Sequence, residues 1–280
     1  MGNNNNRGGR SGGSIGPRGG RDQHRSSGGG SDRYKGGDKS NRDGNLYRSG
    51  HDQKGDSARR ETLRTGGTGG ADLPRWIKEE VSLNTSKLKR DMTLNLLGEA
   101  ADAFADGRFP KAYGRLIKAK ELSNRTPTIR ELLGLTAYRM ERWDGALKEL
   151  RTYRRLAGDT THMAVEMDCL RALGRDRDVE KTWNTFMELG GRPASNGEIR
   201  VVFGSYLLDK GEDRRAWAIT NPGRLGAEPA EWDLRQWYVA ARAATALGDI
   251  ATARQLIKAI ESHELSFPGL SELHEEISNS

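Results

Sequence analysis

A short pattern of residue types recurs in the chain at an interval of 34 residues. The segment DGRFPKAYGRLIKA begins at Asp106, and the segment MERWDGALKELRTY begins at Met140. Both carry an aromatic residue, then an alanine and then a leucine, in the matched pairs Phe109 and Trp143, Ala112 and Ala146, and Leu116 and Leu150. Steps of three and four residues place such side chains on one face of a helix. A period of this length predicts repeated helical units that bury their apolar faces against one another.

Helical spacing of apolar residues extends through most of the chain. In the first segment Leu94, Leu97 and Ala101 recur at three- and four-residue steps, and no stretch shows the sustained alternation of a strand. Turn signals divide the chain into five predicted helix pairs, at residues 92–124, 127–157, 160–190, 196–220 and 231–265. A short polar helix at 268–278 could cover the open end of the stack. We therefore predict an all-α fold.

The predicted folded part begins at Leu73 and extends to residue 280. Pro74 suits the start of a helix, because the first helical turn does not need the N–H that proline lacks. Trp76 and Ile77 follow directly, and we expect both side chains to pack inward.

A helix–turn–helix period of 34 residues resembles the tetratricopeptide repeat. Other residues that match the pattern of this family are Leu133, Gly134, Ala216, Trp237 and Ala253. In the third pair, Val179 or Glu180 stands at the small position, depending on the alignment. Residues 73–190 are also similar to a group of tetratricopeptide proteins of high-GC Gram-positive bacteria that has no assigned biochemical activity. The resemblance implies a TPR-like α-solenoid of about five helix pairs with a binding surface, not a reaction.

The first quarter of the chain, residues 1–72, differs in composition from the rest. It holds 20 of the 36 glycines and 14 basic against 8 acidic residues, so it carries nearly all of the net charge of +7. Because so few apolar residues cannot offset the entropy of ordering, we predict a disordered tail. Arginines set among glycines can track a phosphate backbone, here Arg7, Arg10, Arg18 and Arg21. Two interpretations stay open: a solvated linker, and a tail in weak, salt-sensitive contact with RNA or DNA.

Familiar catalytic and targeting patterns are missing from the sequence. The single cysteine, Cys169, allows no intramolecular disulfide, and the N-terminus lacks the apolar segment of a secretory signal. No apolar run is long enough to span a membrane, so we expect a cytoplasmic protein. P-loop, dinucleotide-binding, nucleophile-elbow and zinc-protease patterns are absent. His162 lies seven residues before Cys169, but nothing nearby completes a set of metal ligands. We predict a non-enzymatic protein without metal or cofactor.

In the tetratricopeptide family the first helix of each unit lines a groove for peptides. Carried over by the resemblance, the groove of this chain would include Leu135, Tyr138, Arg139, Ser205, Tyr238 and Arg242. Tyr and Arg are residue types enriched at binding hot spots. Leu97 and Ala101 stand where some family members grip a peptide carboxylate, so that clamp is absent. The alternative is that Tyr138 packs between units and Arg139 is solvated.

Charge is distributed unevenly along the predicted folded part. Residues 73–159 hold 18 basic and 12 acidic groups, whereas residues 160–280 hold 14 and 19. Two basic stripes with helical spacing occupy equivalent helices of the first two pairs, Lys111, Arg115 and Lys118, then Lys148, Arg151 and Arg155. Stacking would join them into a basic patch for nucleic acid or an acidic protein. They could equally be solvated faces partly paired with nearby acids, or the asymmetry could favour head-to-tail self-association.

Two functional hypotheses follow from these observations. The first is a protein–protein scaffold, in which the solenoid groove binds a segment of a partner and the basic tail is a flexible arm. The second is an RNA-associated or DNA-associated protein, in which the tail and the basic patch carry the affinity. Binding to nucleic acid should depend steeply on salt, since each neutralised phosphate releases counterions.

Overall fold

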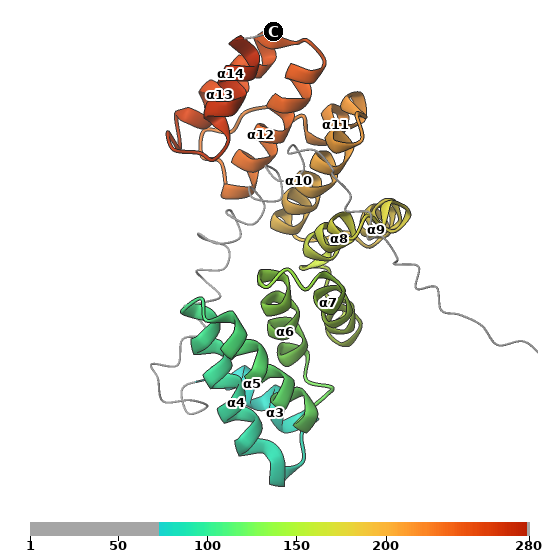
Figure 1. The fold of residues 1–280 in the computed structure, drawn as a ribbon, viewed down its shortest axis with the longest axis vertical. Helices are drawn as coiled ribbons and strands as arrows, with labels where there is room; N and C mark the ends of the chain where they lie inside the picture. The colour runs from blue at the N-terminus through green and yellow to red at the C-terminus, as the bar shows by residue number, and fades with distance from the viewer. Residues whose placement is uncertain (1–72, 279–280) are drawn as a thin grey trace, which may run out of the picture. The chain divides into compact units, whose positions relative to one another are not determined.

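The computed structural model describes residues 73–278, and these are helical with no strand among them, which confirms the predicted all-α fold. The twelve helices of this part of the chain are α3 (Arg75–Asn84), α4 (Lys87–Ala105), α5 (Phe109–Leu122), α6 (Pro127–Arg139), α7 (Trp143–Ala157), α8 (Met163–Ala172), α9 (Asp176–Leu189), α10 (Pro193–Asp209), α11 (Asp213–Thr220), α12 (Glu231–Ala246), α13 (Ile250–Glu261) and α14 (Leu270–Ser278). Figure 1 labels them in chain order. The predicted tail at 1–72 lies outside the described residues.

Helices α4 to α13 lie within or close to the five predicted segments, but several ends differ, and α8 begins at Met163 instead of residue 160. Helix α4 begins at Lys87 instead of residue 92, and α10 begins at Pro193 instead of residue 196. Leu88 is 93% exposed, so the first turn of α4 adds nothing to the buried stripe from which the helix was predicted. Pro193 occupies a first-turn position, where its fixed φ suits a helix. The fifth pair ends at Glu261 instead of residue 265.

The same turn joins the two helices of every pair. Its central residue has a positive φ of 58° to 78°, and the five residues are Gly107, Glu141, Gly174, Gly211 and Gly248. In each turn the next N–H donates to the carbonyl five residues earlier, as from Arg108 to Ala103 at 2.7 Å and from Asp249 to Ala244 at 2.9 Å. This is the Schellman arrangement, which satisfies carbonyls at the end of the first helix. The recurrence makes the five pairs structurally equivalent at their turns.

Equivalent positions in the second helices are buried in all five pairs. Counted from the turn, the fifth residue is 0% exposed each time, and these residues are Ala112, Ala146, Val179, Ala216 and Ala253. The geometry therefore resolves the alignment of the third pair, where Val179 and not Glu180 takes the small position. A compact side chain here lets the second helix approach the first.

In two of the pairs, a glycine on the first helix allows the second helix of the same pair to approach closely. A Cβ atom placed on Gly134 would lie 2.7 Å from the side chain of Leu150, and one on Gly204 would lie 2.4 Å from that of Thr220. Both glycines stand seven residues before their turns, and both contacts are to the ninth residue after the turn. In each of these two pairs the helices therefore cross at the glycine, where a side chain would not fit.

Aromatic residues repeat across the turns of the first two pairs. Phe109 packs edge-to-face on Phe104, with ring centroids 5.6 Å apart, and Trp143 packs in the same way on Tyr138 at 5.5 Å. Such pairs contribute about 0.5–1.5 kcal/mol beyond the area they bury. The aromatic residue of the 34-residue pattern thus packs the start of the second helix against the end of the first helix in the same pair.

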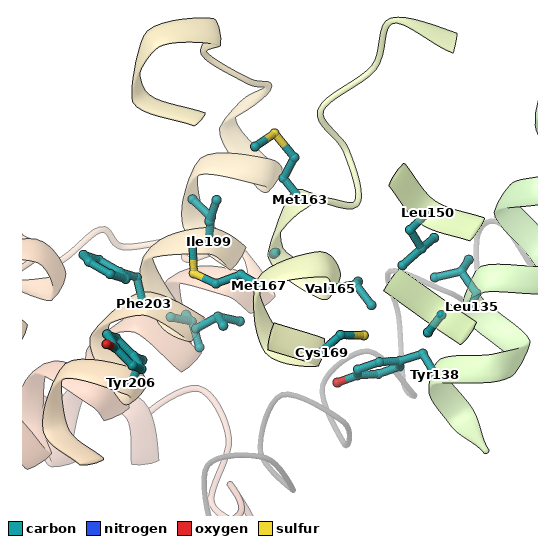
Figure 2. Close-up of a cluster of buried hydrophobic side chains, with 14 of the residues drawn as sticks. Leu135, Tyr138, Leu150, Met163, Val165, Met167, Cys169, Ile199, Phe203 and Tyr206 are labelled. Atoms are coloured by element: carbon teal, nitrogen blue, oxygen red, sulfur yellow. The ribbon is translucent and has the colours of Figure 1, made fainter. Parts of the chain in front are cut away.

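Neighbouring pairs are joined through a continuous core. Helix α5 packs on α6, α7 on α8 and α11 on α12, while α10 packs on both α8 and α12. Figure 2 shows α8 between two sets of side chains, with Met167 near Ile199 and Phe203 and with Cys169 near Tyr138. Because α8 contacts the pairs on both sides, the third pair completes the core of the second and the fourth.

Helix α3 precedes the five pairs and packs on α4. Ile77 and Val81 are buried one turn apart, as expected for an amphipathic helix. The prediction that Trp76 also packs inward is wrong, because this side chain is 48% exposed. Residue 76 lies about 100° around the helix from Ile77, and the buried stripe of α3 is too narrow to include both.

Candidate interaction surfaces

A chain of polar contacts links the first helices of the second, third and fourth pairs. The hydroxyl of Tyr138 on α6 donates to Asp168 on α8 at 2.6 Å. Asp168 also accepts from Arg171, which in turn donates to Asp209 on α10 at 2.8 Å. Tyr138 and Asp168 are both buried, so their hydrogen bond replaces solvation that each group has given up. These contacts fix the register of three successive pairs.

Glu149 holds three helices of the first two pairs together. Its carboxylate on α7 accepts from Lys120 on α5 at 2.9 Å and from Arg130 on α6 at 2.5 Å. Burial acts to raise the pKa of Glu149, but hydrogen bonds from Arg130 and Lys120 outweigh it, and the pKa is lowered. The carboxylate of Glu149 is therefore ionised, and each of its two oxygens accepts from a basic partner.

Buried carboxylates recur between the later pairs. Glu166 on α8 accepts from Arg154 on α7 at 2.9 Å, and Glu131 on α6 contacts His162 at 2.6 Å. Glu198 on α10 pairs with Arg235 on α12, which also pairs with Glu231. Burial raises the pKa of Glu198 even though Arg235 acts in the opposite direction. Glu131, Glu166 and Glu198 each bridge two elements, so their charges have a structural role.

The six predicted groove residues lie on three first helices, α6, α10 and α12. Four of them are at most 5% exposed, namely Leu135, Tyr138, Ser205 and Tyr238, whereas Arg139 and Arg242 are half-buried. Figure 2 places Leu135 and Tyr138 in the cluster around α8. The hydroxyl of Tyr138 is engaged by Asp168, and that of Tyr238 donates to the carbonyl of Gly269 at 3.3 Å. A peptide site along these helices stays a prediction.

Two of the six residues of the predicted basic patch are paired. Arg115 pairs with Glu99 on α4 at 2.6 Å, and Arg151 lies 3.7 Å from Glu166. The other four are exposed, namely Lys111, Lys118, Lys148 and Arg155. Their helices α5 and α7 are neighbours, since Lys120 bonds Glu149 and the guanidinium of Arg142 lies 4.6 Å from the ring centre of Tyr113. The structure thus brings four of the six together as exposed charges on adjacent helices.

Sequence reasoning missed exposed basic residues on later second helices. They are Arg177 and Lys181 on α9, Arg214 on α11, and Arg254 and Lys258 on α13. Three of them share a helix face with the first four. Lys181 is the seventh residue after its turn, as Lys148 is, and Arg177 and Arg214 are each the third residue, one helical turn before that position. Alignment by the turn could have found them, but the irregular spacing of the later pairs and the missing glycine at Glu141 hid that alignment.

Exposed apolar side chains concentrate at the start of the described part. Trp76 and Leu83 lie on α3, and Leu88 and Met92 lie on the first turns of α4. All four are more than a third exposed. None of them belongs to the predicted groove or to the basic patch.

The remaining candidate for reactive chemistry is Cys169 on α8. It is fully buried, and its burial, together with Asp168 and Glu166, raises the pKa of its thiol well above the usual range. Cys169 is therefore a small buried side chain, and a protonated thiol without access to solvent is inert. Within residues 73–278 no cluster of three or more potential metal ligands occurs. No helix among the same residues combines the length and apolar character that crossing a membrane requires.

Comparisons with protein-family models, with curated proteins and with solved structures each find no match. The predicted nucleic-acid contacts Arg7, Arg10, Arg18 and Arg21 lie outside the residues that the structure describes.

Proposed function

We propose that the protein is a non-enzymatic scaffold of the cytoplasm, built as a tetratricopeptide-like α-solenoid, that binds a segment of a protein partner along its first helices. The observation that carries this proposal is the fivefold recurrence of one hairpin turn, with a left-handed residue and the same hydrogen bonds each time. Stacked repeats of one unit form extended surfaces suited to binding another chain, and not a single enclosed pocket. The helical-repeat class rests on this geometry together with the 34-residue period.

Two carboxylates with shifted pKa values, Glu149 and Glu198, support a structural role for the charges of this fold. A shifted pKa marks a catalytic candidate when the group lies in a cleft and is available to a substrate. Glu149 is instead held by Lys120 and Arg130, and Glu198 by Arg235. We therefore assign no catalytic residue and no cofactor.

Arg139 and Arg242 are the members of the predicted groove best suited to report on a partner. Both are half-buried on first helices, α6 and α12, whereas the other four groove residues are buried. A guanidinium group offers several donors in a planar fork and can hold a carboxylate or a backbone carbonyl of a bound segment. The scaffold proposal predicts that one partner reaches both positions.

Site-specific photo-crosslinking of the full-length protein in its own cells tests this. A photoreactive phenylalanine analogue would replace Arg139 or Arg242, with Glu275 on α14, an exposed residue outside the groove, as the matched control. We expect the same protein in crosslinks from Arg139 and Arg242, before and after nuclease digestion, and not in crosslinks from Glu275. Crosslinks at the two groove positions that do not differ from the control would contradict the proposal.

A further inference from the structure

Exposed basic side chains without partners form a series along the second helices. They are Lys111 and Lys118 on α5, Lys148 and Arg155 on α7, Arg177 and Lys181 on α9, and Arg214 on α11, and together they are called the outer basic face. Within the described residues none of the seven makes an ion pair or a hydrogen bond through its side chain. Exposed acidic residues on the same four helices number three, namely Glu121, Asp144 and Glu188. The surface therefore keeps an excess of unneutralised positive charge.

The four second helices that carry this face are neighbours in series. Lys120 on α5 bonds Glu149 on α7. The hydroxyl of Thr160, just after α7, donates to the carbonyl of Gly190, just after α9, at 3.0 Å. Arg215 on α11 pairs with Glu180 on α9 at 3.1 Å. Because each helix or its end is linked to the next, the seven charges lie on neighbouring elements.

The spacing within each helix suits an extended polyanion. Lys111 and Lys118 are seven residues apart, as are Lys148 and Arg155, so each pair points the same way at a separation of about 10 Å along its helix. All four positions lie outside the buried stripe of the second helices, which includes Ala112 and Ala146. A row of like charges that faces solvent raises the local concentration of anions and steers a charged partner to the surface.

The composition of the face favours nucleic acid over an acidic protein. Protein–protein interfaces depend on buried aromatic and apolar anchors at their centre. On these four helices the only exposed large apolar residues are Met187 and Leu189, both at the end of α9. Nucleic-acid interfaces are more polar and much more positive. The absence of an exposed aromatic side chain from the face disfavours stacking on bases, so contact would be with phosphates.

We propose that the outer basic face binds the phosphate backbone of double-stranded nucleic acid, without reading its sequence. This surface lies on the second helices and is separate from the groove on the first helices to which the protein partner is assigned. The inference therefore goes beyond the scaffold function, and either of the two can fail without the other.

Binding of the full-length protein to a fluorescent 20-base-pair RNA duplex, and to the DNA duplex of the same sequence, tests the proposal. Anisotropy would be measured from about 50 to 200 mM salt, the range in which phosphate binding dominates affinity. The first variant carries Lys111→Gln, Lys118→Gln, Lys148→Gln and Arg155→Gln. We expect affinity at the lowest salt to fall at least tenfold. The slope of log K against log salt should fall by about 0.9 for each phosphate that the variant no longer neutralises.

The matched control changes the net charge equally but removes exposed basic residues that already have carboxylate partners. It carries Arg75→Gln, Arg108→Gln, Arg175→Gln and Lys210→Gln, whose partners are Glu79, Asp106, Asp178 and Asp176. We expect its salt slope to stay within about one of the wild-type value. Circular dichroism and thermal unfolding of both variants establish that each is folded.

Three results would overturn the proposal. If both variants weaken binding equally, net charge and not the outer basic face determines it. If neither variant weakens binding, the duplex binds elsewhere on the chain or not at all. If polyglutamate displaces the duplex as effectively as unlabelled duplex does, the face accepts any polyanion, including an acidic protein.

Discussion

At Gly204 the backbone of α10 lies so close to α11 that a methyl group does not fit between them. A Cβ atom there would lie 2.4 Å from Thr220 and 3.1 Å from Val239, both of which are buried. Because neither neighbour has free space into which to move, we expect Gly204→Ala to destabilise the protein by about 1–3 kcal/mol. Thermal unfolding followed by circular dichroism measures the change.

The control is Gly114→Ala on α5, where no atom lies within 4 Å of the added Cβ. Alanine is the better helix former by about 0.5–1 kcal/mol, so this variant should unfold at the wild-type temperature or slightly above it. Equal melting temperatures for Gly204→Ala and Gly114→Ala would show that the close approach of α10 and α11 is not part of the fold.

Glu149 and Glu198 should respond to acid in opposite directions when each is replaced by glutamine. The lowered pKa of Glu149 means that its stabilisation is present above the unfolded pKa of about 4.3 and is lost as pH falls through the folded value. Glu149→Gln should therefore cost about 2 kcal/mol at pH 7, because it leaves Lys120 and Arg130 poorly paired, and less toward pH 3.

The raised pKa of Glu198 gives the opposite dependence of stability on pH. The folded state then holds the proton more tightly than the unfolded state, so wild-type stability rises as pH falls from the folded pKa toward about 4.3. The free energy of unfolding of the wild type, relative to that of Glu198→Gln, should therefore increase as pH falls through the same range. Melting curves from pH 3 to 7 for both variants test the pair, and parallel trends would contradict these assignments.

Among the elements, the hairpin turn of the second pair departs from the other four. Glu141 occupies the left-handed position with a φ of 58°, where the other turns have glycine. A non-glycine residue in this conformation costs about 1–2 kcal/mol. We therefore expect Glu141→Gly to raise the free energy of unfolding by about 0.5–1 kcal/mol, minus what the glutamate side chain itself contributes. Chemical denaturation measures the gain, and Gly174→Ala at the equivalent turn should lower the free energy of unfolding by a comparable amount.

The elements that could be predicted from sequence are those with an inward apolar stripe. The 34-residue spacing from Ala112 to Ala146 and from Leu116 to Leu150 predicted two helix pairs and their alignment with each other. The first turn of α4 carries no buried side chain, so nothing in the pattern marked its start. The turn at Glu141 lacks the glycine that signals its conformation, and the third pair could not be aligned until the turn geometry selected Val179.

The candidate surfaces were less predictable than the elements, because pairing between distant helices decides which charges are available. Arg115 and Arg151 belong to the predicted basic stripes, yet their partners Glu99 and Glu166 come from other helices. Neither partner lies three or four residues away, where sequence reasoning looks for it. For the same reason the hydrogen bond between Tyr138 and Asp168, 30 residues apart, could not be anticipated.

For the molecule as a whole, the described helices separate two kinds of surface. Hydrogen bonds from Tyr138 to Asp168 and from Arg171 to Asp209 join first helices, and the outer basic face of the second helices presents unpaired basic side chains to solvent. Under the two proposals, the first helices bind a protein segment and the second helices bind nucleic acid. The two activities should then respond independently to mutation.

The measurement that tests the scaffold function most directly is recovery of crosslinked partners of the full-length protein from its own cells, with and without nuclease. Wild type would be compared with the variant that carries glutamine at Lys111, Lys118, Lys148 and Arg155. We predict that one defined protein is recovered in both treatments and equally by both forms. Recovery that requires intact nucleic acid, or that disappears in the variant, would contradict a protein-binding scaffold as the primary function.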